Sequence, residues 1–117
     1  MELPRQQFLS ESEDLIEQVF ASLDELREPA TAPQQRELIE HIFRQVHRIK
    51  GSAGSFGFTG LAEIAHEFEH LLSALRSEDV VIKDSVVDAC ESATLALSES
   101  LTLAASGVIE PSRRELF

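Results

Sequence analysis

The sequence predicts an all-α protein folded as an up-down-up-down antiparallel four-helix bundle. Four segments carry apolar residues at intervals of three or four, which places them on one face of a helix. No segment of comparable length shows the strict alternation of a half-buried strand. The links between the four segments are short, so successive helices are expected to lie side by side and antiparallel. The chain, at 117 residues, has the size of one domain.

The first two helices are delimited by prolines. The first is expected to end near Glu28 and Pro29, because the residue before a proline avoids the helical region. The second is expected to begin around Pro33, since proline suits a first helical turn. Their apolar stripes are Phe8, Ser12, Leu15, Val19, Leu23 and Leu26 in the first helix, and Leu38, Ile42, Val46, Ile49 and Ala53 in the second.

The third and fourth helices have polar residues at their expected starts. Thr59 is the predicted N-cap of the third, and Asp84 or Ser85 that of the fourth, which Gly107 should terminate. The bundle then covers residues 1–107, and residues 108–117 form a tail that is either a linker or a short additional helix. The stripes are Leu61, Ile64, Phe68, Leu71 and Leu75 in the third helix, and Val86, Cys90, Ala93, Leu97, Leu101 and Ala104 in the fourth.

Composition excludes several classes of function. A formal net charge of −11 argues against a nucleic-acid surface, because phosphate binding needs a basic face. No apolar run reaches the length of about twenty residues that a membrane span requires, so no membrane insertion is expected. The single cysteine, Cys90, excludes an internal disulfide and suits a reducing compartment. We therefore expect a cytoplasmic protein.

The segment around His47 places a histidine on the shoulder of the second helix. At 100° per residue, Lys50, Gly51 and Gly54 lie within roughly 60° of His47, which is about a quarter turn or more from the apolar stripe. The same count puts Glu69 on a shoulder of the third helix, and antiparallel neighbours bring such shoulders together. A carboxylate that accepts the Nδ1 proton leaves Nε2 with a free lone pair. Glu69 is therefore the expected partner of His47.

Glycines and phenylalanines mark the end of the second helix. Gly51 and Gly54 each cost about 1 kcal/mol relative to alanine inside a helix, which indicates a functional or close-packing reason. The alternative is a helix that frays early. Phe56 and Phe58 are expected to anchor the exit of this helix in the core.

Two further histidines could bind a metal. His66 and His70 are four residues apart and could clamp a transition metal together with Glu63 or Glu67. The sequence offers no convincing third and fourth ligand on another element, so no metal site is expected.

The run His47-Arg-Ile-Lys50-Gly51-Ser-Ala-Gly54-Ser-Phe-Gly-Phe58-Thr-Gly-Leu61, followed by His66 and Glu69, resembles a known family. It is similar to the histidine-containing phosphotransfer (HPt) domain, in particular to the P1 domain of chemotaxis-type (CheA) histidine kinases. The resemblance implies a helical bundle whose exposed histidine takes a phosphoryl group from the ATP-binding domain of a histidine kinase. The group then passes to an aspartate on the receiver domain of a response regulator.

The resemblance also implies roles for single residues. His47 would be the phosphoacceptor, Lys50 its electrostatic support, and Gly51 the small residue that, with Gly54, leaves room for partners. Glu69 would hold the acceptor ring, and His66 would be an auxiliary histidine. No cofactor would be bound, because ATP and Mg²⁺ would belong to the partner domains, and the domain would be monomeric.

Two alternatives remain open at this point. One is a helical interaction module that docks signalling partners without carrying phosphate, and the other is a metal-binding bundle. The chain contains no recognisable nucleotide-binding, dimerisation or receiver sequence. It is therefore expected to act as a phosphocarrier, either as a module of a histidine kinase or as a free-standing protein, and not as a complete enzyme.

Overall fold

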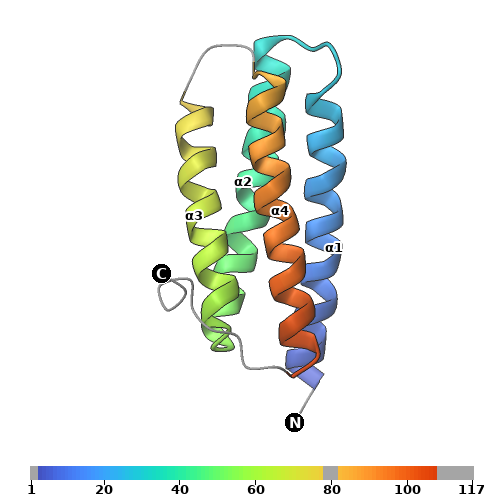
Figure 1. Cartoon of the computed structure of the whole chain (residues 1–117), viewed down its shortest axis with the longest axis vertical. Coiled ribbons are helices and arrows are strands. Elements are labelled where there is room, and N and C mark those ends of the chain that lie inside the picture. Colours follow the sequence, from blue (N-terminus) through green and yellow to red (C-terminus); the bar gives the residue numbers. More distant parts are fainter. Residues whose placement is uncertain (1–2, 78–81, 108–117) are drawn as a thin grey trace.

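The computed structural model describes residues 3–77 and 82–107, and within these residues the chain is all-helical. The elements are α1 (Leu3–Leu26), α2 (Ala32–Ser55), α3 (Thr59–Arg76) and α4 (Asp84–Ala105). They run alternately up and down side by side, as Figure 1 shows. The predicted antiparallel four-helix bundle is confirmed. The predicted tail or short helix at 108–117 lies outside the described residues.

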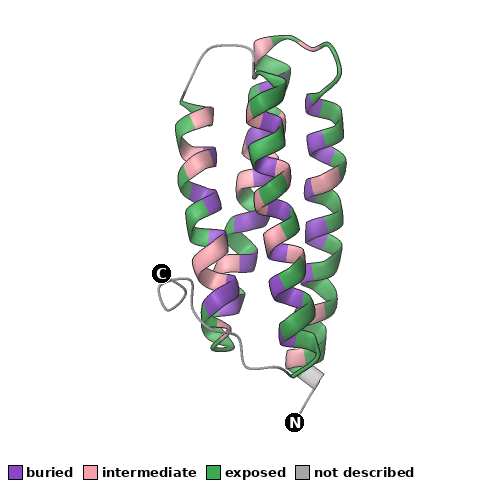
Figure 2. Ribbon diagram, in the orientation of Figure 1, coloured by how far each residue is buried: buried purple, intermediate pink, exposed green. Residues whose placement is uncertain are grey.

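The four helices are arranged in a ring. The contacts among described residues join α1 to α2, α2 to α3, α3 to α4 and α4 to α1, so each helix packs against two neighbours. Buried residues line the inner side of every helix (Figure 2). None of the helices in the described part of the chain is long and apolar enough to cross a membrane.

The buried faces of α3 and α4 are rotated from their predicted positions. In α3 the predicted Leu71 is only partly buried, whereas Leu72 is fully buried. In α4 Val87 replaces the predicted Val86 in the core. The predicted stripes omitted several small or polar residues that the structure buries. These are Ala65 and Glu69 in α3 and Thr94 and Ser100 in α4.

The predicted starts of α3 and α4 are wrong by one or two residues. Phe58 is the N-cap of α3, and Thr59 is the first helical residue. Lys83 is the N-cap of α4, which begins at Asp84. Neither cap makes a side-chain hydrogen bond to the helix, so the polar residues that predicted these starts do not act as caps. A capping box was missed instead at Thr31, whose side chain accepts from the backbone N–H of Gln34.

The end of α2 is a well-defined turn and does not fray. The Phe58 N–H donates to the Ala53 carbonyl at 2.9 Å, and the Gly57 N–H donates to the Gly54 carbonyl at 3.2 Å. This pair of bonds is the Schellman motif, and Gly57 supplies the positive φ of 79° that it requires. Phe58 packs against the core as predicted, but Phe56 is 40% exposed, so its predicted core role is wrong. Gly107 ends α4 with a φ of 81°.

Candidate functional site

His47 presents its imidazole to solvent from the C-terminal half of α2. The side chain is 62% exposed. Of its two neighbours in the chain, Val46 is buried in the core and Arg48 is exposed. The ring is nevertheless fixed in place. Its Nδ1 lies 2.6 Å from Oε2 of Glu69, which α3 carries. The predicted pairing of His47 with Glu69 is therefore present in the structure.

Glu69 lies deeper than a shoulder position, with only 10% of its side chain exposed. Its second oxygen, Oε1, accepts a hydrogen bond from Nζ of Lys50 at 2.7 Å. Burial alone would raise the pKa of Glu69, but the hydrogen bonds from Lys50 and His47 outweigh it and lower the pKa. The carboxylate is therefore ionised at neutral pH and shared between an ammonium group and an imidazole.

This arrangement selects one form of the His47 ring. An ionised carboxylate can only accept, so the hydrogen bond to Glu69 requires a proton on Nδ1. In the neutral ring Nε2 then carries the lone pair. Since the side chain is mostly exposed, that nitrogen is available to an electrophile brought by another molecule.

An aromatic stack, which the sequence analysis missed, supports the ring. The Phe43 ring lies nearly parallel to that of His47, with centroids 6.1 Å apart and an interplanar angle of 9°. The guanidinium carbon of Arg76 lies 4.0 Å from the centroid of the Phe43 ring, and Arg76 also pairs with Glu40 at 3.1 Å. The available signal was spacing, because Phe43 precedes His47 by four residues and shares its helix face.

Gly51 and Gly54 lie inside α2, and neither is required by packing within the domain. A Cβ added at either position would meet no atom within 4 Å. The close-packing explanation for these glycines is therefore excluded for the described structure. The bare backbone at Gly51 instead forms part of an open hollow beside His47, lined by His47, Arg48, Gly51, Ser52, Ser55 and Phe56.

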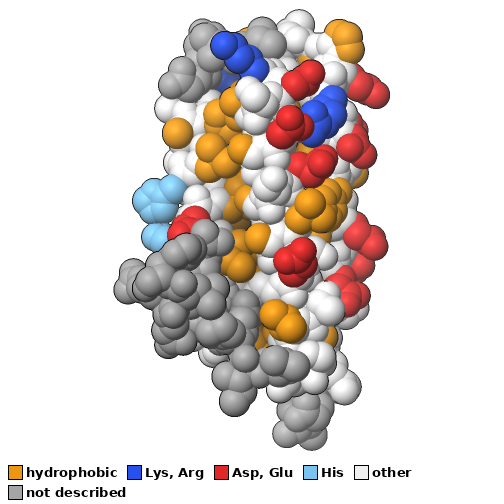
Figure 3. All heavy atoms as spheres, viewed as in Figure 1, with side chains coloured by type: hydrophobic (Ala, Val, Ile, Leu, Met, Phe, Trp, Pro, Cys, Tyr) orange, Lys and Arg blue, Asp and Glu red, His pale blue; other side chains and the backbone are white. Residues whose placement is uncertain are grey.

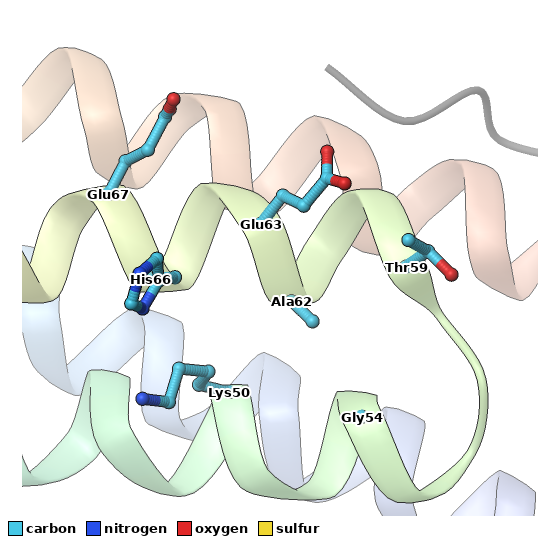
Figure 4. Close-up of a pocket in the computed structure, with 7 residues that line it drawn as sticks. All are labelled: Lys50, Gly54, Thr59, Ala62, Glu63, His66 and Glu67. Carbon is cyan, nitrogen blue, oxygen red and sulfur yellow. The ribbon is translucent and has the colours of Figure 1, made fainter. Parts of the chain in front are cut away.

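A second hollow lies between α2 and α3, on the other side of Lys50. Figure 4 shows the His66 ring and the Lys50 side chain in the space between the two helices, whereas Glu63 and Glu67 point away from α2. The predicted auxiliary residue His66 therefore shares a groove with Lys50. Its ring makes a hydrogen bond to His70, with the two Nε2 atoms 3.2 Å apart. The residues that line this groove are Lys50, Gly54, Thr59, Ala62, Glu63, His66 and Glu67.

Metal-ligating side chains do not converge around these histidines. Among the residues that the structure describes, no group of three or more His, Cys, Asp or Glu side chains could hold a metal ion. Cys90 is buried in the core, and its burial raises the pKa of the thiol to about 11. It takes no part in the site around His47.

The fold and the site together define a helical domain that exposes one imidazole held by a buried carboxylate. The family model described as Hpt domain matches residues 5–106 of the chain. The chain belongs to the Hpt domain family, and is thus a phosphotransfer module of two-component signalling.

Three relatives of the chain share one name. The chemotaxis protein CheA of Cereibacter sphaeroides is 35% identical over 103 residues, which cover 88% of this chain and 15% of that protein. CheA of Salmonella typhimurium is 32% identical over 83 residues, 71% of this chain and 12% of that protein. CheA of Rhizobium meliloti is 37% identical over 70 residues, 60% of this chain and 9% of that protein. The chain therefore matches only a small part of each relative.

Proposed function

We propose that His47 carries a phosphoryl group between the ATP-binding domain of a histidine kinase and an aspartate on a response-regulator receiver domain. The observation that supports this most directly is the 2.6 Å hydrogen bond between Nδ1 of His47 and Glu69. It leaves the exposed Nε2 as the nucleophile and holds the ring in one orientation while a partner approaches.

Two displacements at phosphorus make up the proposed cycle. In the first, the Nε2 lone pair attacks the γ-phosphorus of ATP, the N–P bond forms, and the bond to the β–γ bridging oxygen breaks as ADP leaves with its electron pair. In the second, an aspartate oxygen of the receiver attacks the same phosphorus, and the N–P electron pair returns to Nε2. The Nδ1 proton stays on the ring in both steps, facing Glu69.

Lys50 is the proposed counter-charge for the phosphoryl group. Its ammonium is already close to the ring, because both groups share the carboxylate of Glu69. When a dianionic phosphoryl group forms on Nε2, Lys50 can turn from Glu69 toward its oxygens. ATP and Mg²⁺ would be bound by the partner domains, and this chain would supply a positioned nucleophile without a cofactor of its own.

The relatives suggest the setting. They are chemotaxis proteins CheA, and we propose that this chain acts in a chemotaxis-type signalling system. The kinase and the response regulator are proposed as partners on the same ground.

Intact mass measurement tests the assignment of His47. The chain and its His47→Gln variant are incubated with a chemotaxis-type kinase core, ATP and Mg²⁺, and part of each sample then receives a brief acid step. One added phosphate on the wild type alone, lost in acid, is the expected result. Equal labelling of both proteins would refute His47 as the acceptor. No uptake from several active kinase cores would favour the interaction module that docks partners without carrying phosphate.

A further inference from the structure

We propose that the outer face of α2 is the surface on which an acidic receiver domain docks, with the carboxylates of its phosphoacceptor pocket over the arginines beside His47. This inference deepens the proposed function and rests on it. It excludes the α2–α3 groove as the receiver's principal contact. The outer face is defined here as Arg44, His47, Arg48, Gly51, Ser52, Ser55 and Phe56.

Charge distribution along the chain separates this face from the rest of the domain. The chain has 21 acidic residues and a net charge of −11, yet no Asp or Glu occurs between His41 and Ala62. The same stretch contains Arg44, Arg48 and Lys50. The outer face of α2 is therefore a basic strip on an acidic domain, and an acidic partner is attracted to it and repelled elsewhere.

The two arginines of the strip are not used inside the domain. In the part of the chain that the structure describes, the side chains of Arg44 and Arg48 form no ion pair or hydrogen bond, and both residues are exposed. Other cations do form ion pairs there, as Arg27 does with Asp88 at 2.7 Å and Lys50 with Glu69 at 2.7 Å. Arg44 and Arg48 therefore keep their donors for carboxylates from another molecule.

The surface is hollowed beside the reactive ring. A hollow of about 410 Å³ is lined by six residues of the outer face, of which Arg48 is charged and none is a carboxylate. Gly51 contributes no side chain to its floor. At one end of the hollow Phe56 is exposed, and its ring is held in place by stacking on Phe8 of α1, with the ring centroids 5.1 Å apart. A receiver would thus meet cations around His47 and a fixed apolar edge at the C-terminal end of α2, nine residues or about two and a half turns beyond.

The groove on the other side of Lys50 suits an acidic partner less well. Two of the residues that line it, Glu63 and Glu67, are carboxylates, and the ammonium of Lys50 is bound to Glu69. Figure 4 shows both carboxylates on the α3 side and directed away from α2, so a carboxylate-lined pocket would pass like charges at the rim of this groove. The remaining surface is also acidic where it can be seen, since Figure 3 shows many Asp and Glu side chains and few Lys or Arg on the face that includes α4.

A matched pair of charge reversals tests the basic strip. Arg48→Glu changes the strip, whereas Lys83→Glu makes the same change of charge at the exposed N-cap of α4, at the other end of the bundle (Figure 1). The His47→Gln form of each is titrated with a panel of chemotaxis receiver domains, and the tightest binder is analysed. We expect Arg48→Glu to weaken binding about tenfold or more at low salt, and Lys83→Glu to change it less than about twofold. The gap should shrink in 1 M salt, where the Debye length is about 3 Å.

A second pair tests the side of approach by steric block. Ser52→Trp fills the outer hollow, and Thr59→Trp fills the mouth of the α2–α3 groove, both from exposed positions. Ser52→Trp should slow phosphoryl transfer from pre-labelled chain to the receiver at least about tenfold, with little effect of Thr59→Trp. Thermal unfolding followed by circular dichroism verifies that each variant folds.

The outcomes separate this inference from the proposed function. Binding needs no phosphate, so loss of affinity in Arg48→Glu supports the docking face even if His47 accepts no label. In the binding experiment, the docking face is refuted if Arg48→Glu and Lys83→Glu bind the receiver equally well, or if no receiver binds. It is also refuted if Arg48→Glu changes only the labelling of the chain by the kinase. In the transfer experiment, it is refuted if Thr59→Trp alone blocks transfer to the receiver. If labelled His47 still passes its phosphoryl group to a receiver, any of these results leaves the proposed function standing and removes only the docking face.

Discussion

At the scale of single residues, the site depends on one carboxylate with two partners. Glu69 holds Nδ1 of His47 and Nζ of Lys50 through its two oxygens, and α3 keeps it largely out of solvent. Replacing it therefore affects both the ring and the neighbouring cation. Orientation of a ring by such an outer carboxylate typically contributes ten- to a hundredfold in metal sites, and a similar contribution is expected here.

The first prediction concerns this carboxylate. Glu69→Ala should slow phosphoryl uptake by His47 by roughly ten- to a hundredfold, because the ring loses its preferred tautomer and its orientation. Rates of labelling by a kinase core and ATP measure the effect. Glu67→Ala, an exposed carboxylate on the same helix, is the control and should label at the wild-type rate. Equal rates for Glu69→Ala and Glu67→Ala would contradict the role of Glu69.

Only part of the site could be predicted from the sequence. Helical angles place His47 and Glu69 on facing shoulders, and the structure brings them into contact. The hydrogen bond from Lys50 to Glu69 was not predicted, because it depends on how deeply α3 sets the carboxylate between the helices. The Phe43 stack was missed since an aromatic residue near a stripe is normally assigned to the core.

At the scale of the elements, α2 keeps glycines that its own packing does not require. Gly51 is helical, and an added Cβ would meet no atom. Glycine in a helix interior costs roughly 0.5–1 kcal/mol relative to alanine, mainly in backbone entropy. The domain therefore gives up stability beside His47, where the proposed partners would approach.

Gly51→Ala should consequently have opposite effects on stability and transfer. The free energy of unfolding should rise by about 0.5–1 kcal/mol, since the methyl group meets nothing and the helix gains propensity. Phosphoryl exchange with the partner domains should become slower. Urea denaturation measures the first effect and transfer rates the second. A stability loss would show that the bundle itself needs the glycine.

The rotation of α3 also has a measurable consequence. Leu72 is fully buried, whereas the predicted Leu71 is only partly buried. Leu72→Ala should therefore lower the free energy of unfolding by about 2–5 kcal/mol and Leu71→Ala by clearly less. Urea denaturation of both variants measures the difference. A larger loss for Leu71→Ala would support the helix rotation inferred from the apolar pattern alone.

That rotation explains where sequence reasoning about elements fails. Periodicity identified all four helices and most of their length, because apolar spacing is a strong signal over several turns. It misjudged the buried face of α3, where the centre of the stripe includes the carboxylate Glu69. A polar residue that is buried for a functional reason makes its face of the helix look solvent-exposed when only apolar spacing is considered. The burial of Glu69 therefore both builds the functional site and explains why the buried face of α3 was misjudged.

At the scale of the whole molecule, stability and pH are linked through the site. The interactions with Lys50 and His47 hold the pKa of Glu69 below its ordinary value. A carboxyl group with a lowered pKa in the folded state stabilises the fold above its unfolded pKa of about 4.3. That contribution is lost as the pH falls through the lower folded value.

Wild type and Glu69→Gln should therefore differ most in stability near neutral pH. The advantage of the wild type in free energy of unfolding should persist down to about pH 5 and then decrease as the carboxyl group becomes protonated. Urea denaturation of both proteins at intervals from pH 7 to pH 3 measures the change. A gap that stays constant over this range would mean that Glu69 contributes through shape and not through its charge.

The link between α1 and α2 lies far from the reactive ring. His47 follows the start of α2 at Ala32 by fifteen residues, or about 22 Å of helix rise. The link, residues 27–31, contains no site residue, and Thr31 at its end begins α2 through the capping box. Foreign peptide inserted at Pro29 or Ala30, such as an epitope or a fluorescent reporter, would thus sit at the opposite end of the bundle. The domain offers a natural attachment point for following the protein while its chemistry continues undisturbed.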